Sequence, residues 1–355
     1  MTLSNITSIY KRSGSKQDMS NQRGIFSLTI FKKILDNLLL NDLYNDVDNG
    51  MSESNIGGRR KRMAKDHLFV LYGVINSVNN DKNEDSIDVL VYDVEKAFDK
   101  LFLDDCINDL IDTLPKHKET DKISLLHKSN ESTKVSVNTP FGQTKRQEYK
   151  NIVQQGGGWG GILCSNSVDT VEKSSLLEPS SVTNYIPYVY EKKLKVPLLS
   201  YIDDTNNISK CGLNALKNNI FITSQIEMKR LKFNVGTERK KSKCQKLHVG
   251  KDASNCIPLH VNKKQMDEVH EISYLGDLVN GFGSNMSNIK NRVSKSRNTI
   301  LNIFSILENM CFGPYYFRVA LLLRESTLIS SATYNADVWY SLNQNELNEF
   351  SSPVF

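Results

Sequence analysis

Residues 198–208 read Leu-Leu-Ser-Tyr-Ile-Asp-Asp-Thr-Asn-Asn-Ile, an apolar run that leads into two adjacent acids and leaves through mixed polar and apolar residues. This pattern predicts a β-hairpin whose turn carries both carboxylates, Asp203 and Asp204. Two like charges on neighbouring residues of a tight turn repel each other, so the arrangement is favourable when a cation binds to it. We therefore expect a magnesium site here, with a solvated surface turn as the alternative.

A second acid-bearing strand is predicted upstream of this hairpin, at residues 86–93. Apolar residues occupy both of its faces, which is typical of a strand buried on both sides, and Asp93 stands at its end. The alternative interpretation of Asp93 is a helix N-cap.

Carboxylates on two facing strands are what the reaction of nucleotidyl transfer requires. This reaction gathers negative charge on a phosphate and on the entering and leaving oxygens. Two magnesium ions held by carboxylates of facing strands would stabilise that charge, and Asp93, Asp203 and Asp204 fit such a site.

The chain has 355 residues, which is enough for a large core and for two or three subdomains. Its net charge is only +5, but basic residues are concentrated at residues 59–65, 145–146 and 239–243. Each cluster taken alone is typical of a solvated surface. Clusters that converge around an acidic centre would instead form a groove for a polyanion.

No apolar stretch approaches the ~20 residues that a membrane span needs, and no secretory signal opens the chain. We therefore expect an intracellular protein of the nucleus or cytoplasm, neither secreted nor membrane-bound, whose six cysteines are reduced thiols. One set, Cys244, His248, Cys256 and His260, has a spacing that could hold zinc. The same region also fits ordinary strand alternation, so zinc binding stays open.

The hydrophobic pattern predicts the remaining elements. Residues 132–149 indicate a hairpin, and five glycines at positions 156–161 favour close approach of another chain or a hinge, with a flexible linker as the alternative. Residues 1–30 form a polar segment whose first apolar piece is residues 25–28, and residues 44–58 are typical of a loop. Helices are predicted around residues 31–39, 68–75, 107–114, 162–177, 213–231, 300–307 and 317–328, and short strands at 245–249 and 272–279.

Five segments, in this order, resemble the motifs of the reverse transcriptase of non-LTR (LINE-type) retrotransposons. They are Tyr92–Asp99 (first catalytic motif), Gln155–Asn166 (template and nucleotide), Tyr201–Asp204 (the Tyr-x-Asp-Asp box), Lys241–Cys244 (the lysine motif) and Tyr274–Gly276 (the primer grip). Residues 21–25 and 54–59 resemble parts of the fingers. The resemblance runs over most of the chain. A single motif is a weak signal, but five in the right order and spacing are a strong one.

The resemblance implies roles for the residues around the acids. Asp93 and Asp203 would ligate two Mg²⁺ ions, for which Mn²⁺ could substitute, with Asp204 in support and the Val94 carbonyl as an extra ligand. Lys243, or Lys241 beside it, would protonate the leaving pyrophosphate.

The resemblance also implies a nucleotide and primer site. Phe98 would lie under the incoming sugar and exclude a 2′-hydroxyl, with a plain core position as the alternative. Further residues with implied roles are Arg59 and Arg62 (triphosphate), Gln155 and Gly156 (nucleotide and template backbone), and Tyr274, Leu275 and Gly276 (primer grip).

The implied fold is α+β, a right-hand polymerase with fingers, a palm containing an antiparallel sheet, and a partial helical thumb. The expected boundaries are fingers at 1–85, palm at 86–114, template-contact hairpin and glycine-rich part of the fingers at 115–160, palm again at 161–284, and a truncated thumb at 285–355. Gly161 departs from the family, which more often has proline there, and this puts the start of the following helix in doubt. We recognise no endonuclease ahead and no zinc region behind, so we expect the polymerase part of a longer element, such as a 5′-truncated or decayed copy.

The expected function is RNA-templated DNA synthesis, in which a primer 3′-hydroxyl attacks the α-phosphate of a dNTP. The expected partners are an RNA template, a DNA primer or target and dNTPs, while the oligomeric state stays open. One alternative is a catalytically inactive, nucleic-acid-binding remnant of such an element. A nearer alternative is an RNA polymerase of viral type or an intron-encoded maturase, which share the acids.

Overall fold

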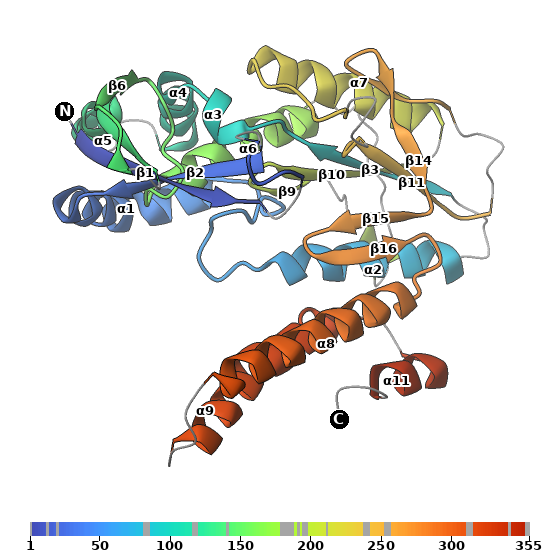
Figure 1. The fold of residues 1–355 in the computed structure, drawn as a ribbon. Coiled ribbons are helices and arrows are strands. Elements are labelled where there is room, and N and C mark those ends of the chain that lie inside the picture. Colours follow the sequence, from blue (N-terminus) through green and yellow to red (C-terminus); the bar gives the residue numbers. More distant parts are fainter. Residues whose placement is uncertain are drawn as a thin grey trace. The chain divides into compact units, whose positions relative to one another are not determined.

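The chain folds as a mixed α/β protein (Figure 1). The computed structural model describes residues 2–11, 14–18, 21–80, 86–115, 120–139, 142–177, 188–189, 192–193, 198–210, 212–236, 242–251, 257–309, 315–339 and 342–351. Its internal contacts divide the chain into two units. The first unit is Met1–Met63, Asp88–Gln245 and Asn255–Asp267, and the second is Ala64–Ile87, Lys246–Ser254 and Glu268–Phe355.

One sheet of the first unit is built around a strand that the sequence pattern did not predict. Strand β1 (Thr2–Tyr10) pairs antiparallel with β2 (Gln22–Leu28) and parallel with β4 (Ser132–Thr139). The short strands β5 (Gly142–Gln143) and β6 (Gln147–Lys150) pair antiparallel with β4, which confirms the hairpin predicted at 132–149. The prediction of a polar segment at residues 1–30 missed β1, because most of its side chains are exposed or half-buried and its partner β4 is distant in the sequence.

The other sheet of the first unit carries the acids. Strands β3 (Ile87–Asp93), β10 (Asp204–Lys210) and β9 (Leu199–Tyr201) lie side by side in that order (Figure 1). Helix α6 (Gly160–Leu177) packs on β9, and α7 (Leu213–Met228) packs on β10. Leu90 and Tyr92 of β3 are fully buried in the core that these helices cover. The strand at 86–93 and the hairpin at 198–208 are therefore confirmed.

Helix α1 (Ile30–Gly50) extends well beyond the predicted 31–39, so the loop predicted at 44–58 is wrong in its first half. Leu43, Tyr44 and Val47 continue the buried stripe of this helix, while the aspartates and asparagines of its second half are exposed or half-buried. The remaining elements of the first unit are α3 (Ala97–Lys100), α4 (Leu103–Thr113), α5 (Thr120–Asn130), β7 (Tyr188–Val189), β8 (Lys192–Lys193), β12 (His260–Val261) and β13 (Lys264–Gln265).

The second unit is built on two long helices and a small hairpin. Helix α2 (Ala64–Asn80) and helix α8 (Met286–Glu308) accompany the antiparallel pair β15 (Glu271–Tyr274) and β16 (Asp277–Asn280). Strands β11 (Gln245–Val249) and β14 (Asp267–Val269) neighbour each other. The C-terminal elements are α9 (Tyr316–Leu323), a π-helical turn (Arg324–Ile329), α10 (Ser330–Ala332), a 3-10 turn (Ala336–Val338) and α11 (Gln344–Ser351). Among the described residues, no helix combines the length and apolarity that crossing a bilayer requires.

Candidate active site

The hairpin that carries Asp203 and Asp204 is held from the side by a backbone segment. Tyr201 of β9 faces Asp204 of β10 across a turn in which Ile202 adopts a left-handed φ of 59°. The backbone nitrogen of Ile56 donates to the carbonyl of Ser200 at 3.0 Å. A Cβ on Gly57 would lie 2.2 Å from the Ile202 nitrogen, so glycine is needed where the two backbones touch.

The three acids of this site share one electrostatic environment. Burial raises the pKa of Asp203 above its ordinary value, and the negative charge of Asp93 raises it further. Burial together with the charges of Asp203 and Asp93 raises the pKa of Asp204 to about 6. The raised pKa values of Asp203 and Asp204 indicate a site in which a bound cation would favour the ionised carboxylates.

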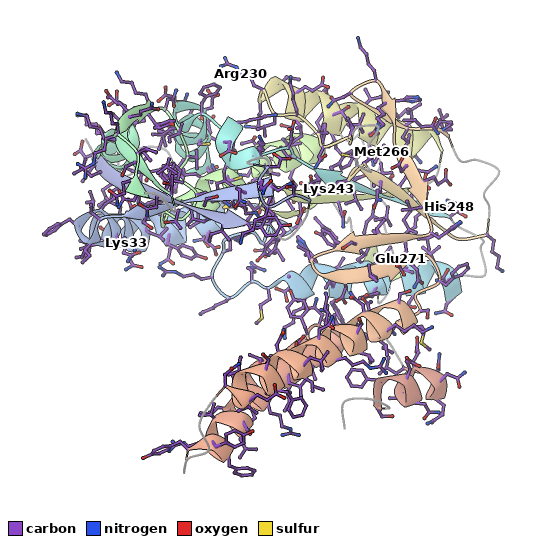
Figure 2. All side chains as sticks on the ribbon, viewed as in Figure 1. Lys33, Arg230, Lys243, His248, Met266 and Glu271 are labelled. Carbon is purple, nitrogen blue, oxygen red and sulfur yellow. The ribbon has the colours of Figure 1, made fainter. Side chains whose placement is uncertain are left out.

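Two positive side chains, Lys243 and Arg23, act on these carboxylates. The ammonium of Lys243 lies 3.2 Å from Oδ1 of Asp93, and its charge lowers the pKa of Asp203 and Asp204, as does that of Arg23. Burial lowers the pKa of Lys11, and the charges of Arg23, Lys96 and Lys243 lower it further. Lys243, labelled in Figure 2, is thus one of four cations that act on one another or on the acids.

Arg23 and Lys11 are the site residues that sequence reasoning missed. Arg23 lies on β2, and Lys11 follows directly on β1, where its backbone nitrogen donates to the Asn21 carbonyl at 2.8 Å. The resemblance to the fingers covered residues 21–25, but without the β1–β2 pairing nothing indicated that Arg23 lies close enough to act on the acids.

The donor chemistry of the acids fits a divalent cation, because carboxylate oxygens are the ligands that Mg²⁺ and Mn²⁺ prefer. Within the described part of the chain, however, no three His, Cys, Asp or Glu side chains gather closely enough to form a ready-made metal site. Val94, the predicted extra ligand, is buried and forms an isolated antiparallel bridge with Phe233.

The two predicted triphosphate ligands do not join this group. The guanidinium of Arg59 is buried and donates to Oδ1 of Asp48 at 2.7 Å and to the carbonyls of Asp48, Ser52 and Asn55. Arg62 pairs with the exposed carboxylate of Glu53. Because its donors are engaged in these bonds, Arg59 stabilises the segment that holds the hairpin.

The glycine-rich segment packs against β2 and α3. The carbonyl of Gln155 accepts a hydrogen bond of 2.9 Å from the nitrogen of Phe26, and a Cβ on Gly156 would lie 3.0 Å from the carbonyl oxygen of Phe26. Phe98 is half-buried in α3, and its ring lies 3.7 Å from the position that a Cβ on Gly160 would take. The glycines therefore allow close approach, as one of the sequence interpretations expected, and the approaching chain is the protein's own backbone.

The predicted primer-grip turn belongs to the second unit. Tyr274 is buried, and its hydroxyl lies 2.9 Å from Nδ1 of His67. Leu275 and Gly276 both have left-handed φ values, 46° and 89°, which give the β15–β16 turn its shape.

The zinc hypothesis gains no support from the part of the set that is described. Cys244 is buried, its pKa is raised by burial to about 11, and its Sγ lies 3.9 Å from the Asp93 carbonyl. Cys256, together with the alternative proton donor Lys241, lies outside the described residues.

No protein-family model matches the sequence, and a search of curated proteins gives no match. Among solved structures, the chain is similar to a telomerase from Candida albicans in complex with a fragment of telomeric RNA. The identity is 13%, the TM-score is 0.48, and the match covers 99% of this chain and 57% of that one. A telomerase from Candida tropicalis without RNA matches at 12% identity and a TM-score of 0.48, over 98% of this chain and 61% of that one. The chain spans less than two thirds of the length of these structures.

Proposed function

We propose that the chain is an RNA-directed DNA polymerase of the non-LTR retrotransposon type, with the right-hand arrangement of fingers, palm and partial thumb. The observation that carries the proposal is the group of Asp93, Asp203 and Asp204 on neighbouring strands, with the charges of Arg23 and Lys243 acting on it. Acids from two strands beside a set of cations suit a reaction in which a polyphosphate is bound and cleaved.

In this proposal, each residue of the site has its own role in phosphoryl transfer. Asp93 and Asp203 would hold two Mg²⁺ ions, with Asp204 and the Val94 carbonyl in support, and bound Mg²⁺ supplies charge neutralisation at the attacking and leaving oxygens. Arg23 would draw the triphosphate toward the acids, and Lys243 would give a proton to the pyrophosphate. Phe98 would exclude a 2′-hydroxyl, while Gln155 and Gly156 would line the template side.

The partners in this proposal are an RNA template, a DNA primer and dNTPs, in the nucleus or cytoplasm. The test is magnesium-dependent extension of a DNA primer on an RNA template by the purified native chain, compared with Asp203→Ala and Asp204→Asn. We expect Asp203→Ala to lose about 10²–10³-fold or more in rate and Asp204→Asn to lose less. Equal extension by the native chain and Asp203→Ala, or no extension by either, would exclude the proposal.

A second candidate function is nucleic-acid binding without catalysis. It is favoured by two facts about the described residues. No three His, Cys, Asp or Glu side chains among them are grouped so that they could hold a metal ion. The ammonium of Lys243 also forms an ion pair with Asp93. Binding of template and primer without incorporation at any Mg²⁺ or Mn²⁺ concentration would select this function.

A further inference from the structure

Asn234 joins two of the residues in the proposed site. Its backbone nitrogen donates to the carbonyl of Asp93 at 2.8 Å, and its side-chain Nδ2 donates to Oδ2 of Asp93 at 2.9 Å. Its own carbonyl accepts from the backbone nitrogen of Lys243 at 3.0 Å. Asn234 is thus hydrogen-bonded to the chain on both sides of the Asp93–Lys243 ion pair.

The segment that carries Asn234 runs as a short continuation of the β3 edge. The backbone nitrogen of Glu95 donates to the carbonyl of Lys232 at 2.7 Å, and Val94 bridges Phe233. The ring of Phe233 lies 5.6 Å from that of Tyr92 in the core. These contacts fix the backbone of Asn234, so its side-chain amide has a defined direction toward the carboxylate.

The two oxygens of Asp93 are held in different ways. Oδ2 accepts from Asn234, whose backbone is anchored twice, and Oδ1 accepts from Lys243, whose side chain is 64% exposed. A lysine ammonium on an exposed four-carbon stem is a mobile, strongly hydrated charge, whereas an amide on an anchored backbone is a fixed neutral donor. The neutral amide also leaves the full negative charge of Asp93 available to a cation.

We propose that Asn234 is a positioning residue that fixes Oδ2 of Asp93, while Oδ1 exchanges the ammonium of Lys243 for a divalent cation. This inference rests on the proposed function of Asp93 as a metal ligand. The ammonium of Lys243 lies 3.2 Å from Oδ1, so a cation that binds this oxygen must displace it. Displacement would also release Lys243 for the leaving pyrophosphate.

The experiment measures Mn²⁺ binding by electron paramagnetic resonance on the full chain, without nucleic acid or dNTP. The variants are Asn234→Ala, Lys243→Ala and Asp203→Ala. The matched control is Asn219→Ala, which removes the buried Oδ1 that accepts a 3.0 Å hydrogen bond from the hydroxyl of Tyr92, one residue before Asp93. Far-UV circular dichroism and thermal unfolding are recorded for every variant.

We expect Asn234→Ala to weaken Mn²⁺ binding about tenfold or more, as loss of the group that orients a metal ligand does elsewhere. Lys243→Ala should bind Mn²⁺ about two- to fivefold more tightly, because a competing cation is removed. Asn219→Ala should bind like the native chain even if its unfolding temperature falls. Native-like Mn²⁺ affinity in Asn234→Ala, or weaker binding in Lys243→Ala, would overturn the inference.

Two further results separate this inference from the proposed function. If the native chain and Asp203→Ala bind Mn²⁺ equally, or neither binds it, the metal site itself is wrong and both fail. If Asp203→Ala loses binding while Asn234→Ala keeps it, only the positioning role fails. Should Asn234→Ala not fold, Asn234→Gln displaces the amide by one methylene without deleting it, and native-like Mn²⁺ affinity in that variant would equally overturn the role.

Discussion

The guanidinium of Arg292 donates a 2.7 Å hydrogen bond to Oδ1 of Asp277, and both side chains are buried in the second unit. The same carboxylate accepts from the indole of Trp339 at 3.0 Å and from the hydroxyl of Tyr72 at 3.3 Å. Arg292 also donates to the carbonyl of Gly276, so the pair links α8 to the β15–β16 turn. Asp277 therefore joins α2, α8, the turn and the 3-10 segment through a single buried charge.

Asp277→Asn is expected to destabilise the protein by about 3–5 kcal/mol, because it leaves the buried Arg292 charge without its partner. Urea denaturation, followed by a probe in the second unit, measures this loss. The control is Asp337→Asn, which breaks the solvent-exposed ion pair with Lys65 and should give no resolvable change. Equal effects of the two variants would mean that the Asp277 network is not a stability centre.

Some strands could be predicted from the sequence because the patterns that indicate them involve only neighbouring residues. The alternation in β3 and the acidic turn between β9 and β10 need only a few neighbouring residues, and both elements form as predicted. Helix α1 was read too short because its second half mixes a buried stripe with many acids and amides. The catalytic roles assigned to Asp93 and Asp203 stay predictions.

Other features depend on pairing between distant segments, which no local pattern reports. Arg23 acts on the acids through strand β2, and Asn234 bonds Asp93 across 141 positions of sequence. Arg59 lies in a basic cluster, and only the structure shows its bonds to Asp48, eleven positions earlier. Arg59, which lies in a basic cluster of the sequence, is thus buried against Asp48, whereas Arg23, on a strand in a segment that the sequence pattern describes as polar, acts on the acids.

Two adjacent glycines at the start of helix α6, Gly160 and Gly161, differ in the space that an added Cβ would have. A Cβ on Gly160 would lie 2.4 Å from the carbonyl oxygen of Gln154, whereas a Cβ on Gly161 would meet nothing within 4 Å. We expect Gly160→Ala to cost about 1–3 kcal/mol in unfolding free energy and Gly161→Ala to add about 0.5–1 kcal/mol. Chemical denaturation of both variants measures the difference. A loss in Gly161→Ala as large as in Gly160→Ala would show that close packing is not what requires glycine here.

Glu172 of α6 is expected to make stability depend on pH. It is fully buried, and it accepts a hydrogen bond from the Ser54 hydroxyl. Burial and the charge of Asp169 raise its pKa to about 8, against the lowering effects of the Ser54 hydrogen bond and of the charges of Arg59 and Lys173. Because the folded state holds a proton that the unfolded state loses near pH 4.5, this group lowers stability as pH rises from about 4.5 to 8, by up to ~1.4 kcal/mol per pH unit.

Glu172→Gln should remove that slope and be more stable than the native chain at pH 8.5, with a smaller difference at pH 5.5. The measurement is urea denaturation of both proteins across this range, taking the difference at each pH so that other titrating groups cancel. A constant difference between the two proteins at every pH would contradict the raised pKa.

Phe98 is expected to set the preference for dNTP over NTP. Its half-buried ring in α3 lies beside the glycine-rich segment, 3.7 Å from the position that a Cβ on Gly160 would take. Phe98→Ala should reduce the ratio of dNTP to NTP incorporation efficiency by roughly 10–100-fold. Phe102→Ala is the control, since that ring is exposed and lies under the guanidinium of Arg230. If Phe98→Ala leaves the ratio of dNTP to NTP incorporation efficiency unchanged, the Phe98 ring is a core residue and does not select the sugar.

Arg23 is expected to contribute to nucleotide binding and to the charge state of the acids. Its positive charge lowers the pKa of Asp203 and Asp204, so Arg23→Ala should raise the pKa of Asp204 above its present value of about 6. An ionised carboxylate is then reached only at higher pH, and the acidic limb of the pH–rate profile should move to higher pH. Loss of a charge-assisted contact to phosphate should also raise the KM for dNTP about 10–100-fold.

Lys33→Ala is the matched control, because the Lys33 side chain is exposed on α1 (Figure 2) and is not among the charges that shift these pKa values. If Arg23→Ala keeps the native KM and pH profile, as the control should, the β1–β2 hairpin has no part in binding the nucleotide, and Lys243 is left as the cation that acts on the acids.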